Sequence, residues 1–339
     1  MEKVIKPTTT STINSTIYRI AITLIFLLLF VLMLKFPAQS VYYAFTGLTL
    51  WFQKMIPALF PFMILSGIMI RMNLTEYFAT VLSPLLKPLF KVSGNGAYCI
   101  IMGFLCGFPM GAKVIADLYV RNKLTKAEAT YLLSFCNNIG PIYFTSFALP
   151  VIGLPITLTY LFGMYGLPLI YGMFLCRIPL SNIKKHKFTR QKNNCKSNTF
   201  VVTCSKSDHR SNTLPPSSNQ LLIHIDDAIQ SAIESITKLG GYMILFNLLN
   251  LIPALLFPQD ILPACNLFLE ITSGISRIGN SHPYIVLTLL PFGGLSCMAQ
   301  TYSIIKGTDL SLGNYFLHKC ILTLITALYY VVVFCFLNV

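Results

Sequence analysis

Two stretches that break helices interrupt strongly apolar sequence: Gly103-Phe-Leu-Cys-Gly-Phe-Pro-Met-Gly-Ala-Lys113 and Ser134-Phe-Cys-Asn-Asn-Ile-Gly-Pro141. Glycine and proline release backbone N–H and C=O groups from the helical hydrogen bonds. Lipid offers these groups no partner, so a broken helix at membrane depth must be buried in protein or line an aqueous cavity. In transporters such breaks surround the substrate. The two stretches therefore indicate more than a membrane anchor.

The composition is that of a polytopic membrane protein. Of the 339 residues, 55% are hydrophobic and 11% are charged, whereas a soluble domain has about 25% charged residues. The net charge of +14 is concentrated in one polar stretch with few aromatic residues and no base-reading motif, which argues against nucleic acid as a partner. Basic residues collect in cytoplasmic loops of membrane proteins. We therefore predict an all-α polytopic fold in the lipid bilayer of the cell.

The basic stretch also divides the chain into parts. We expect an N-terminal polar segment with the first transmembrane helix (1–40), a first half (41–180), a basic cytoplasmic linker (181–222) and a second half (223–339). The first apolar run is too long, and its flank too poor in small residues, for a cleaved signal peptide. The positive-inside rule places both termini and the linker in the cytoplasm.

Apolar runs of about 20 residues predict the membrane spans, which are Tyr18–Phe36, Met55–Met72, Tyr131–Leu154, Ile156–Cys176, Leu239–Phe257 and Phe316–Leu337. The stretch Leu74–Lys91 is predicted to lie along the interface, and Asn95–Met110 to be a re-entrant limb. After the linker we expect an amphipathic segment at Ile223–Lys238, a segment at Leu262–Ile278 that carries Glu270, and an apolar segment over Tyr284–Ile305 split by Pro291 and Gly293-Gly294. Thr125 and Glu128 have the spacing of a capping box.

A weak repeat relates the two halves. Phe62–Leu65 is echoed by Tyr242–Leu245, and Gly107–Lys113 is echoed by Gly294–Gln300. The charge pattern gives the two copies opposite orientations in the membrane. This arrangement is typical of inverted-repeat transporters, whose binding site lies near the midplane where the copies meet.

The first two polar constellations lie in the helix-breaking stretches. A broken tip that precedes a helix N-terminus presents free N–H groups and the positive end of a dipole, which suits an anion or a polar solute, and Lys113 adds charge. Alternatively, the tip is a tight turn with Lys113 at the headgroups. The carboxamides of Asn137 and Asn138 are costly in apolar sequence unless paired. They either bind a solute or cap the half-helices made by Pro141.

The other two constellations lie in the second half, at 270–274 and 292–300. A lone carboxylate in an apolar helix is a functional candidate, so Glu270 is expected to serve proton or sodium coupling or to recognise donor groups of a solute. The alternative is an internal ion pair with Lys113 or Arg277. The predicted substrate-binding residues are Gly107, Pro109, Gly111, Lys113, Asn137, Asn138, Glu270, Thr272, Gly294, Ser296 and Gln300.

Motifs of soluble enzymes and of ATP-driven pumps are absent from the sequence, including the Walker loop, HExxH and GxSxG. Cys195 and Cys204 have a spacing that matches no common zinc site, and most other cysteines lie in apolar segments. We therefore expect no enzymatic activity, no cofactor and no metal site.

The segments GFPMGAK, SFCNNIGP, LEITSG and FGGLS…Q, in this order, resemble the YlbJ family of sporulation integral membrane proteins, which carry nucleoside-recognition (Gate) domains. The resemblance runs from about Thr46 to the C-terminus. The chain departs from the family in having Cys297-Met298 where a histidine often follows, and in its long linker. The resemblance implies a role in endospore formation, in the cell or forespore membrane of a Gram-positive bacterium.

Two functions stay open at this point. The first is transporter-like handling, not driven by ATP, of a small polar solute such as a nucleoside or an organic anion. The second is a structural role in spore assembly, in which the protein recruits other sporulation membrane proteins without transport. A homo-oligomer is compatible with both.

Overall fold

The computed structural model describes residues 9–177 and 218–337, and the regular elements in this part of the chain are all helices, without strands. Five helices in it are long and apolar enough to cross a membrane, or six if one bent pair counts as a span. They are Pro37–Arg71, Leu158–Leu175, Gln220–Leu256, Pro283–Ile305 and Leu312–Phe336. The predicted all-α polytopic fold is therefore confirmed. Most of the predicted linker lies outside the described residues.

Three π-helical turns interrupt the α-helices. In chain order the elements are α1 (Thr9–Lys35), α2 (Pro37–Leu50), η1 (Trp51–Met55), α3 (Ile56–Arg71), α4 (Thr75–Phe90), α5 (Gly94–Cys106), α6 (Met110–Val120), α7 (Lys126–Leu133), α8 (Pro141–Tyr143), η2 (Phe144–Ala148), α9 (Leu149–Val151), α10 (Leu158–Leu161), η3 (Phe162–Gly166), α11 (Leu167–Leu175), α12 (Ser218–Leu249), α13 (Leu251–Leu256), α14 (Leu262–Leu269), α15 (Ile271–Ile278), α16 (Pro283–Leu289), α17 (Gly294–Ile305) and α18 (Leu312–Leu337).

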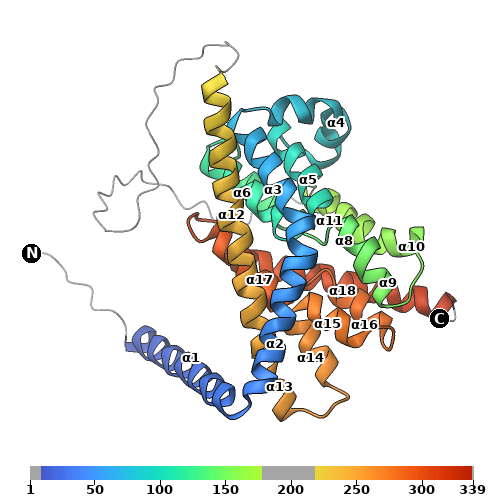
Figure 1. Ribbon diagram of the computed structural model, residues 1–339. Coiled ribbons are helices and arrows are strands. Elements are labelled where there is room, and N and C mark those ends of the chain that lie inside the picture. Colours follow the sequence, from blue (N-terminus) through green and yellow to red (C-terminus); the bar gives the residue numbers. More distant parts are fainter. Residues whose placement is uncertain (1–8, 178–217, 338–339) are drawn as a thin grey trace, which may run out of the picture.

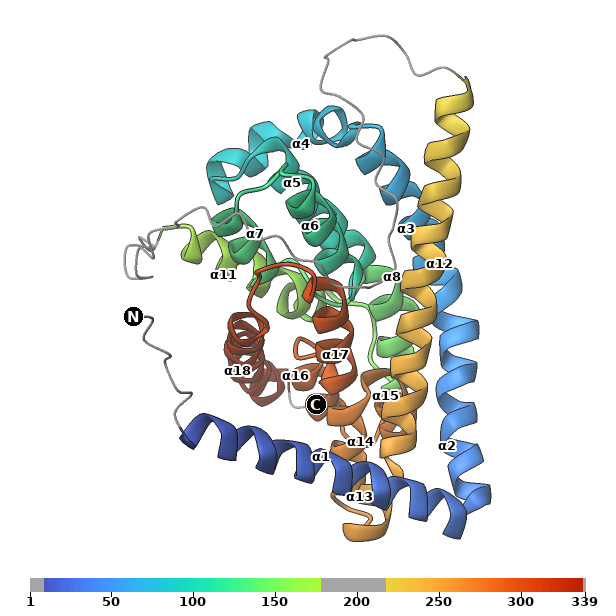
Figure 2. The same ribbon diagram turned by 90° about the vertical axis from the view of Figure 1, so that its left-hand side faces the viewer.

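Two long helical rods, α2–η1–α3 and α12, lie side by side along the whole molecule (Figures 1 and 2). They run in opposite directions, because Arg71 at the end of the first rod pairs with Asp227 near the start of α12. Further along, the indole of Trp51 donates a hydrogen bond to the carbonyl of Ile236 at 2.8 Å. Antiparallel rods agree with opposite orientations of the two repeat copies, while the inverted relation of the whole halves stays a prediction.

The predicted division at Lys238/Leu239 between an amphipathic segment and a span is not a helix boundary, since α12 continues through it. Polar groups in the N-terminal half of α12 have partners within the protein. Asp227 pairs with Arg71, and Ser231 accepts a hydrogen bond from Lys113.

Two predicted apolar segments each contain a break. Tyr131–Leu154 is interrupted, as its helix-breaking residues predict, by an irregular stretch over 134–140 between α7 and α8, and Pro141 is the first residue of α8. Leu262–Ile278 is interrupted at Glu270, whose side chain caps α15. By contrast, the predicted split of 284–305 is confirmed, because α16 and α17 are separate helices.

The re-entrant region contains a sharp bend and a cap. The helices Pro84–Phe90 and Gly94–Cys106 are inclined at 95°, and α5 then turns into α6 at Gly107–Pro109. The capping box is half formed. Thr125 accepts a hydrogen bond from the N–H of Glu128, but the Glu128 carboxylate accepts one from the N–H of Ser93 at 2.7 Å. Glu128 thereby ties α7 to the start of α5.

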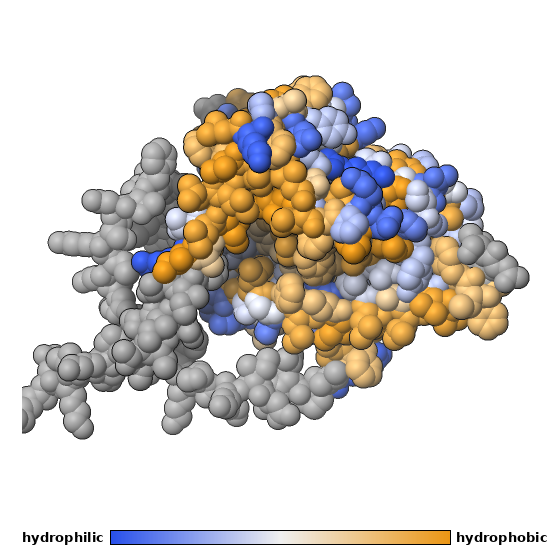
Figure 3. Space-filling view, turned by 90° about the horizontal axis from the view of Figure 1, so that it is seen from below, coloured by the Kyte–Doolittle hydropathy of each residue, from blue (hydrophilic) through white to orange (hydrophobic). Residues whose placement is uncertain are grey.

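Apolar side chains cover much of the outer surface, as expected of a protein that faces lipid. Leu324, Leu328 and Val332 are exposed at four-residue spacing along α18. Figure 3 shows the face seen from below, where hydrophobic residues form broad areas and hydrophilic residues gather in patches. The predicted first span, apart from Phe36, falls on α1, which is not among the five candidate spans and extends away from the helical body (Figure 1).

Candidate functional site

The helix break between α5 and α6 packs directly against the irregular stretch over 134–140. Gly107 has a φ of +80°, and a Cβ added there would lie 2.2 Å from the backbone nitrogen of Gly140. A Cβ on Gly111 would lie 2.7 Å from the carbonyl oxygen of Cys136. These predicted site glycines therefore let two broken backbones touch.

The break between α16 and α17 touches the first break from the other side. Gly293 and Gly294 have φ values of +79° and +78°. A Cβ on Gly293 would lie 2.9 Å from the ring of Phe108, and one on Gly294 would lie 3.2 Å from the carbonyl oxygen of Phe268. Phe108 thus connects the broken helices of the two halves.

Asn137 and Asn138 are fully buried and hydrogen-bonded within the protein. The carboxamide oxygen of Asn137 accepts from the N–H of Ala112 at 3.2 Å. Its nitrogen donates to the hydroxyls of Thr301 and Tyr315, at 3.2 and 2.9 Å. Because Thr301 and Tyr315 belong to α17 and α18, Asn137 joins the two halves.

Lys319 completes this cluster from the middle of α18, and it is wholly buried. Its ammonium group donates to the carbonyl of Asn137 and, at 2.9 Å, to the side-chain oxygen of Asn138. It also lies 4.6 Å from the centre of the Phe108 ring, a cation–π contact. The cluster satisfies the buried charge with oxygens and an aromatic face rather than with a carboxylate.

Glu270 is 2% exposed and occupies the junction of α14 and α15. Its carboxylate accepts hydrogen bonds from the N–H groups of Thr272 and Ser273, at 3.1 and 2.7 Å. The amide of Asn247 on α12 donates to it at 3.4 Å. A carboxylate at a helix N-terminus is favoured by the helix dipole. Glu270 makes no ion pair with Lys113 or Arg277, because Lys113 pairs with Asp117 and Arg277 lies over the ring of Tyr43.

The four breaks meet at one cavity, which we call the central cavity. It is bounded by Phe108 from the first break, Gly140 from the second, Glu270 from the third and Cys297 just after the fourth. Side chains of α3, α5 and α12 complete a mostly apolar wall. The polar groups in this wall include Glu270, Thr272 and Gln300. The buried hydroxyl of Tyr143 also faces it and has no partner in good hydrogen-bond geometry, although Thr272 is its neighbour.

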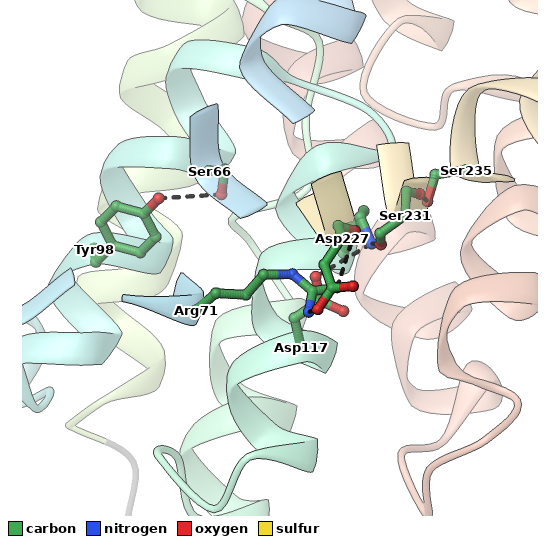
Figure 4. A network of polar contacts seen from close by, with 8 residues as sticks. Ser66, Arg71, Tyr98, Asp117, Asp227, Ser231 and Ser235 are labelled. Atoms are coloured by element: carbon green, nitrogen blue, oxygen red, sulfur yellow. Dashed lines mark hydrogen bonds and ion pairs between the residues drawn. The ribbon is translucent and has the colours of Figure 1, made fainter. Parts of the chain in front are cut away.

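A second hollow, the polar cavity, lies between α6, α12 and α17. It is lined by Pro109, Lys113, Asp117, Ser231 and Gln300, among others. Lys113 lies 3.2 Å from both Asp117 and Ser231. Figure 4 shows Asp117 and Ser231 beside the neighbouring Arg71–Asp227 pair. Since Gln300 lines both hollows and donates to Ser296 at 3.0 Å, it stands between them.

The structure thus distributes the predicted site residues over three places. Glu270, Thr272 and Gln300 line the central cavity; Pro109 and Lys113 line the polar cavity; and Asn137 and Asn138 form the buried cluster. Sequence reasoning missed Lys319 and Asn247. A lysine inside the apolar run that became α18 was a readable signal, whereas the role of Asn247 depends on the packing of α12 against α14.

Within residues 9–177 and 218–337, no three His, Cys, Asp or Glu side chains are grouped as metal ligands. The described cysteines are free thiols.

Comparison with known proteins relates this site to a family. Residues 52–173 match the Gate family model, described as nucleoside recognition. The chain is 25% identical over 333 residues to the sporulation integral membrane protein YlbJ of Bacillus subtilis strain 168, with 90% of this chain and 80% of the relative covered. No solved structure matches the chain. The resemblance drawn from the sequence motifs is thus confirmed, and this chain is a homologue of a sporulation integral membrane protein with a Gate domain.

Proposed function

We propose that this protein passes a small polar solute through the membrane without ATP hydrolysis, and that the solute binds in the central cavity. The observation that carries the proposal is the convergence of four helix breaks on that cavity. Broken helices expose backbone groups that lipid cannot satisfy, and in transporters they form substrate sites. A protein that only anchored partners would have no need of four such breaks at one place.

A nucleoside is the first solute to test, because the family that matches residues 52–173 is described by nucleoside recognition. The cavity has the chemistry for it. The rings of Phe108 and Tyr143 offer apolar faces against which a base could stack. The Glu270 carboxylate accepts hydrogen bonds from ribose hydroxyls, and Gln300 both donates and accepts. A mostly apolar pocket with few convergent polar groups is the usual form of a small-molecule site.

The cellular process is proposed from the relative, whose name assigns it to sporulation. We place the protein in the cell membrane or forespore membrane of an endospore-forming bacterium, with termini and linker in the cytoplasm. We infer no enzymatic role, since neither the matched family model nor the relative is described as an enzyme and the cavity holds no nucleophile paired with a base.

The experiment is a binding measurement on the purified full chain in detergent. Thermal unfolding is followed with nucleosides, amino acids, dicarboxylic acids and divalent metals, for the parent, Thr272→Val and Ala58→Phe. Thr272→Val removes a hydroxyl from the cavity, and Ala58→Phe fills its wall. A ligand that stabilises the parent but neither variant supports the proposal. Thr159→Val, on α10, is the control.

One observation favours the structural role as second candidate. The Asn137–Asn138–Lys319 cluster is saturated with internal hydrogen bonds, as in a bridge that holds two halves together. If no solute stabilises the parent, while deletion of 184–218 abolishes sporulation without affecting membrane insertion, the role in assembly is preferred.

A further inference from the structure

Within residues 9–177 and 218–337, the buried carboxylate of Glu270 forms no ion pair with a lysine or an arginine. The ion pairs among the described residues join Arg71, Lys113, Lys126 and Lys238 to other acids. The remaining buried ammonium, on Lys319, is held by Asn137 and Asn138. An unpaired charge at low dielectric carries a large desolvation penalty.

The hydrogen bonds that Glu270 accepts do not remove this charge. Two come from backbone N–H groups and one from the Asn247 amide, and all three donors are neutral. A carboxylate has about four lone-pair sites, so the group retains the capacity to bind a cation.

Asn247 places an unpartnered oxygen beside this carboxylate. Its side-chain nitrogen donates to the carbonyl of Met243 at 2.9 Å and to Glu270 at 3.4 Å. A flipped amide would point its oxygen at two acceptors, so the orientation is fixed by the network. The oxygen is then buried, in a residue with no exposed surface, and has no hydrogen-bond partner.

Two more buried amide oxygens without partners lie close by in the chain. Asn250 follows Asn247 by three residues, at the junction of α12 and α13, and Asn266 precedes Glu270 by about one turn of α14; both side-chain oxygens are buried and unpaired. Helices α12 and α14 pack against each other. Unsatisfied buried acceptors are rare in native proteins and call for a water or an ion.

We propose that Glu270 and Asn247 bind a monovalent alkali cation, with Asn250 and Asn266 as further oxygen donors. One carboxylate balances one positive charge, whereas a divalent ion would leave a net charge buried and usually takes more carboxylates. The site adjoins the central cavity through Glu270, so such a cation would be suited to couple to the solute of the proposed function. Its binding requires no solute, and the proposed site departs from the expectation of no metal site.

The test follows thermal unfolding of the purified full chain, without solute, as NaCl or KCl replaces choline chloride at constant ionic strength. Sodium or potassium should raise the melting temperature of the parent by several degrees in a saturable manner, and the two arms show which ion is preferred. Glu270→Gln should abolish the response, and Asn247→Ala should raise the half-saturating concentration at least tenfold. Glu234→Gln, a surface carboxylate on α12 paired with Lys238, should respond like the parent.

Three outcomes would overturn the inference. The first is a parent equally stable in sodium, potassium and choline. The second is a cation response that persists in Glu270→Gln. The third is a parent whose melting temperature in choline chloride rises as the pH is lowered, together with a Glu270→Gln variant that has the same raised melting temperature at neutral pH. A proton, and not a cation, would then neutralise the carboxylate. If Glu270→Gln does not fold, the half-saturating cation concentration of Asn247→Ala is compared with that of the parent, and equal values would overturn the inference. Because no solute is present, a negative result leaves solute binding to be judged separately.

Discussion

The ammonium group of Lys319 lies 2.9 Å from the side-chain oxygen of Asn138, although the two residues are 181 positions apart in the sequence. Each belongs to a different half of the chain. Their contact fixes the irregular stretch over 134–140 against α18, beside Phe108. The geometry of the broken helices therefore depends on one buried amine in the last helix.

Lys319→Met should destabilise the protein by about 1–3 kcal/mol. It leaves the oxygens of Asn137 and Asn138 unpaired, at about 1–3 kcal/mol each, while removal of the buried charge offsets part of the loss. The measurement is thermal unfolding in detergent, with Lys306→Met at an exposed position as control. Adding Asn138→Leu should recover part of the stability. Equal melting temperatures of parent and Lys319→Met would show that the contact is unimportant.

Gly107→Ala should disrupt the contact of the first two breaks. The new Cβ would meet the Gly140 backbone at 2.2 Å with φ at +80°, so two backbones must separate, and we expect a loss above about 3 kcal/mol. Gly94→Ala is the matched control, since a Cβ there meets nothing within 4 Å. Unfolding temperatures and protease sensitivity of both variants provide the comparison; similar values for the two would contradict the close approach.

The sequence predicted the breaks that glycine and proline cause. Gly107–Pro109, Gly140-Pro141 and Gly293-Gly294 are visible because glycine readily adopts the positive φ found at Gly107, Gly293 and Gly294, and because proline lacks the N–H that a helix interior requires. The break at Glu270 has no such residue. It forms because the glutamate side chain bonds to two N–H groups of the next helix, a choice that depends on the packing around it.

Long-range partners account for the rest of the differences. The polar first half of α12 is bound by Arg71, which is 156 residues from Asp227. A local sequence pattern cannot indicate a partner at that separation. Lys319 was visible as a charge in an apolar run, yet its partners, Asn137 and Asn138, lie in the other half. The candidate residues were thus found mostly one by one, while their grouping into two cavities and a buried cluster required the fold.

The Asp309–Lys126 pair should give a measurable pH dependence. Lys126 at 2.8 Å and Tyr119 at 2.6 Å hold the pKa of Asp309 below its ordinary value. Its ionised form therefore stabilises the fold above about pH 4, and this contribution disappears as the pH falls through the lowered pKa. Because the pair is exposed, Asp309→Asn should cost at most about 1 kcal/mol at neutral pH.

In melting curves against pH, the parent and Asp309→Asn should differ near neutrality and converge in acid. The same contact raises the pKa of Tyr119 to about 12, so the contribution of its protonated form is lost in alkali between about pH 10 and that value. Asp260→Asn, in the exposed loop before α14, should leave the parent curve unchanged. A constant offset between parent and Asp309→Asn at all pH values would contradict the assignment.

The contact between the two long rods has a built-in reporter, because Trp51 is the single tryptophan of the chain. Its ring packs on Gly240, where a Cβ would lie 2.5 Å from the indole. Gly240→Val should displace the indole, break its hydrogen bond to Ile236 and loosen α12 from η1. We expect altered tryptophan emission and a loss of about 1–3 kcal/mol, the usual result of overpacking. At the neighbouring Gly241 a Cβ would meet nothing within 4 Å. Gly241→Val should therefore keep the parent emission spectrum. Identical emission spectra for the two variants would contradict the packing of the Trp51 indole on Gly240 between the two antiparallel rods.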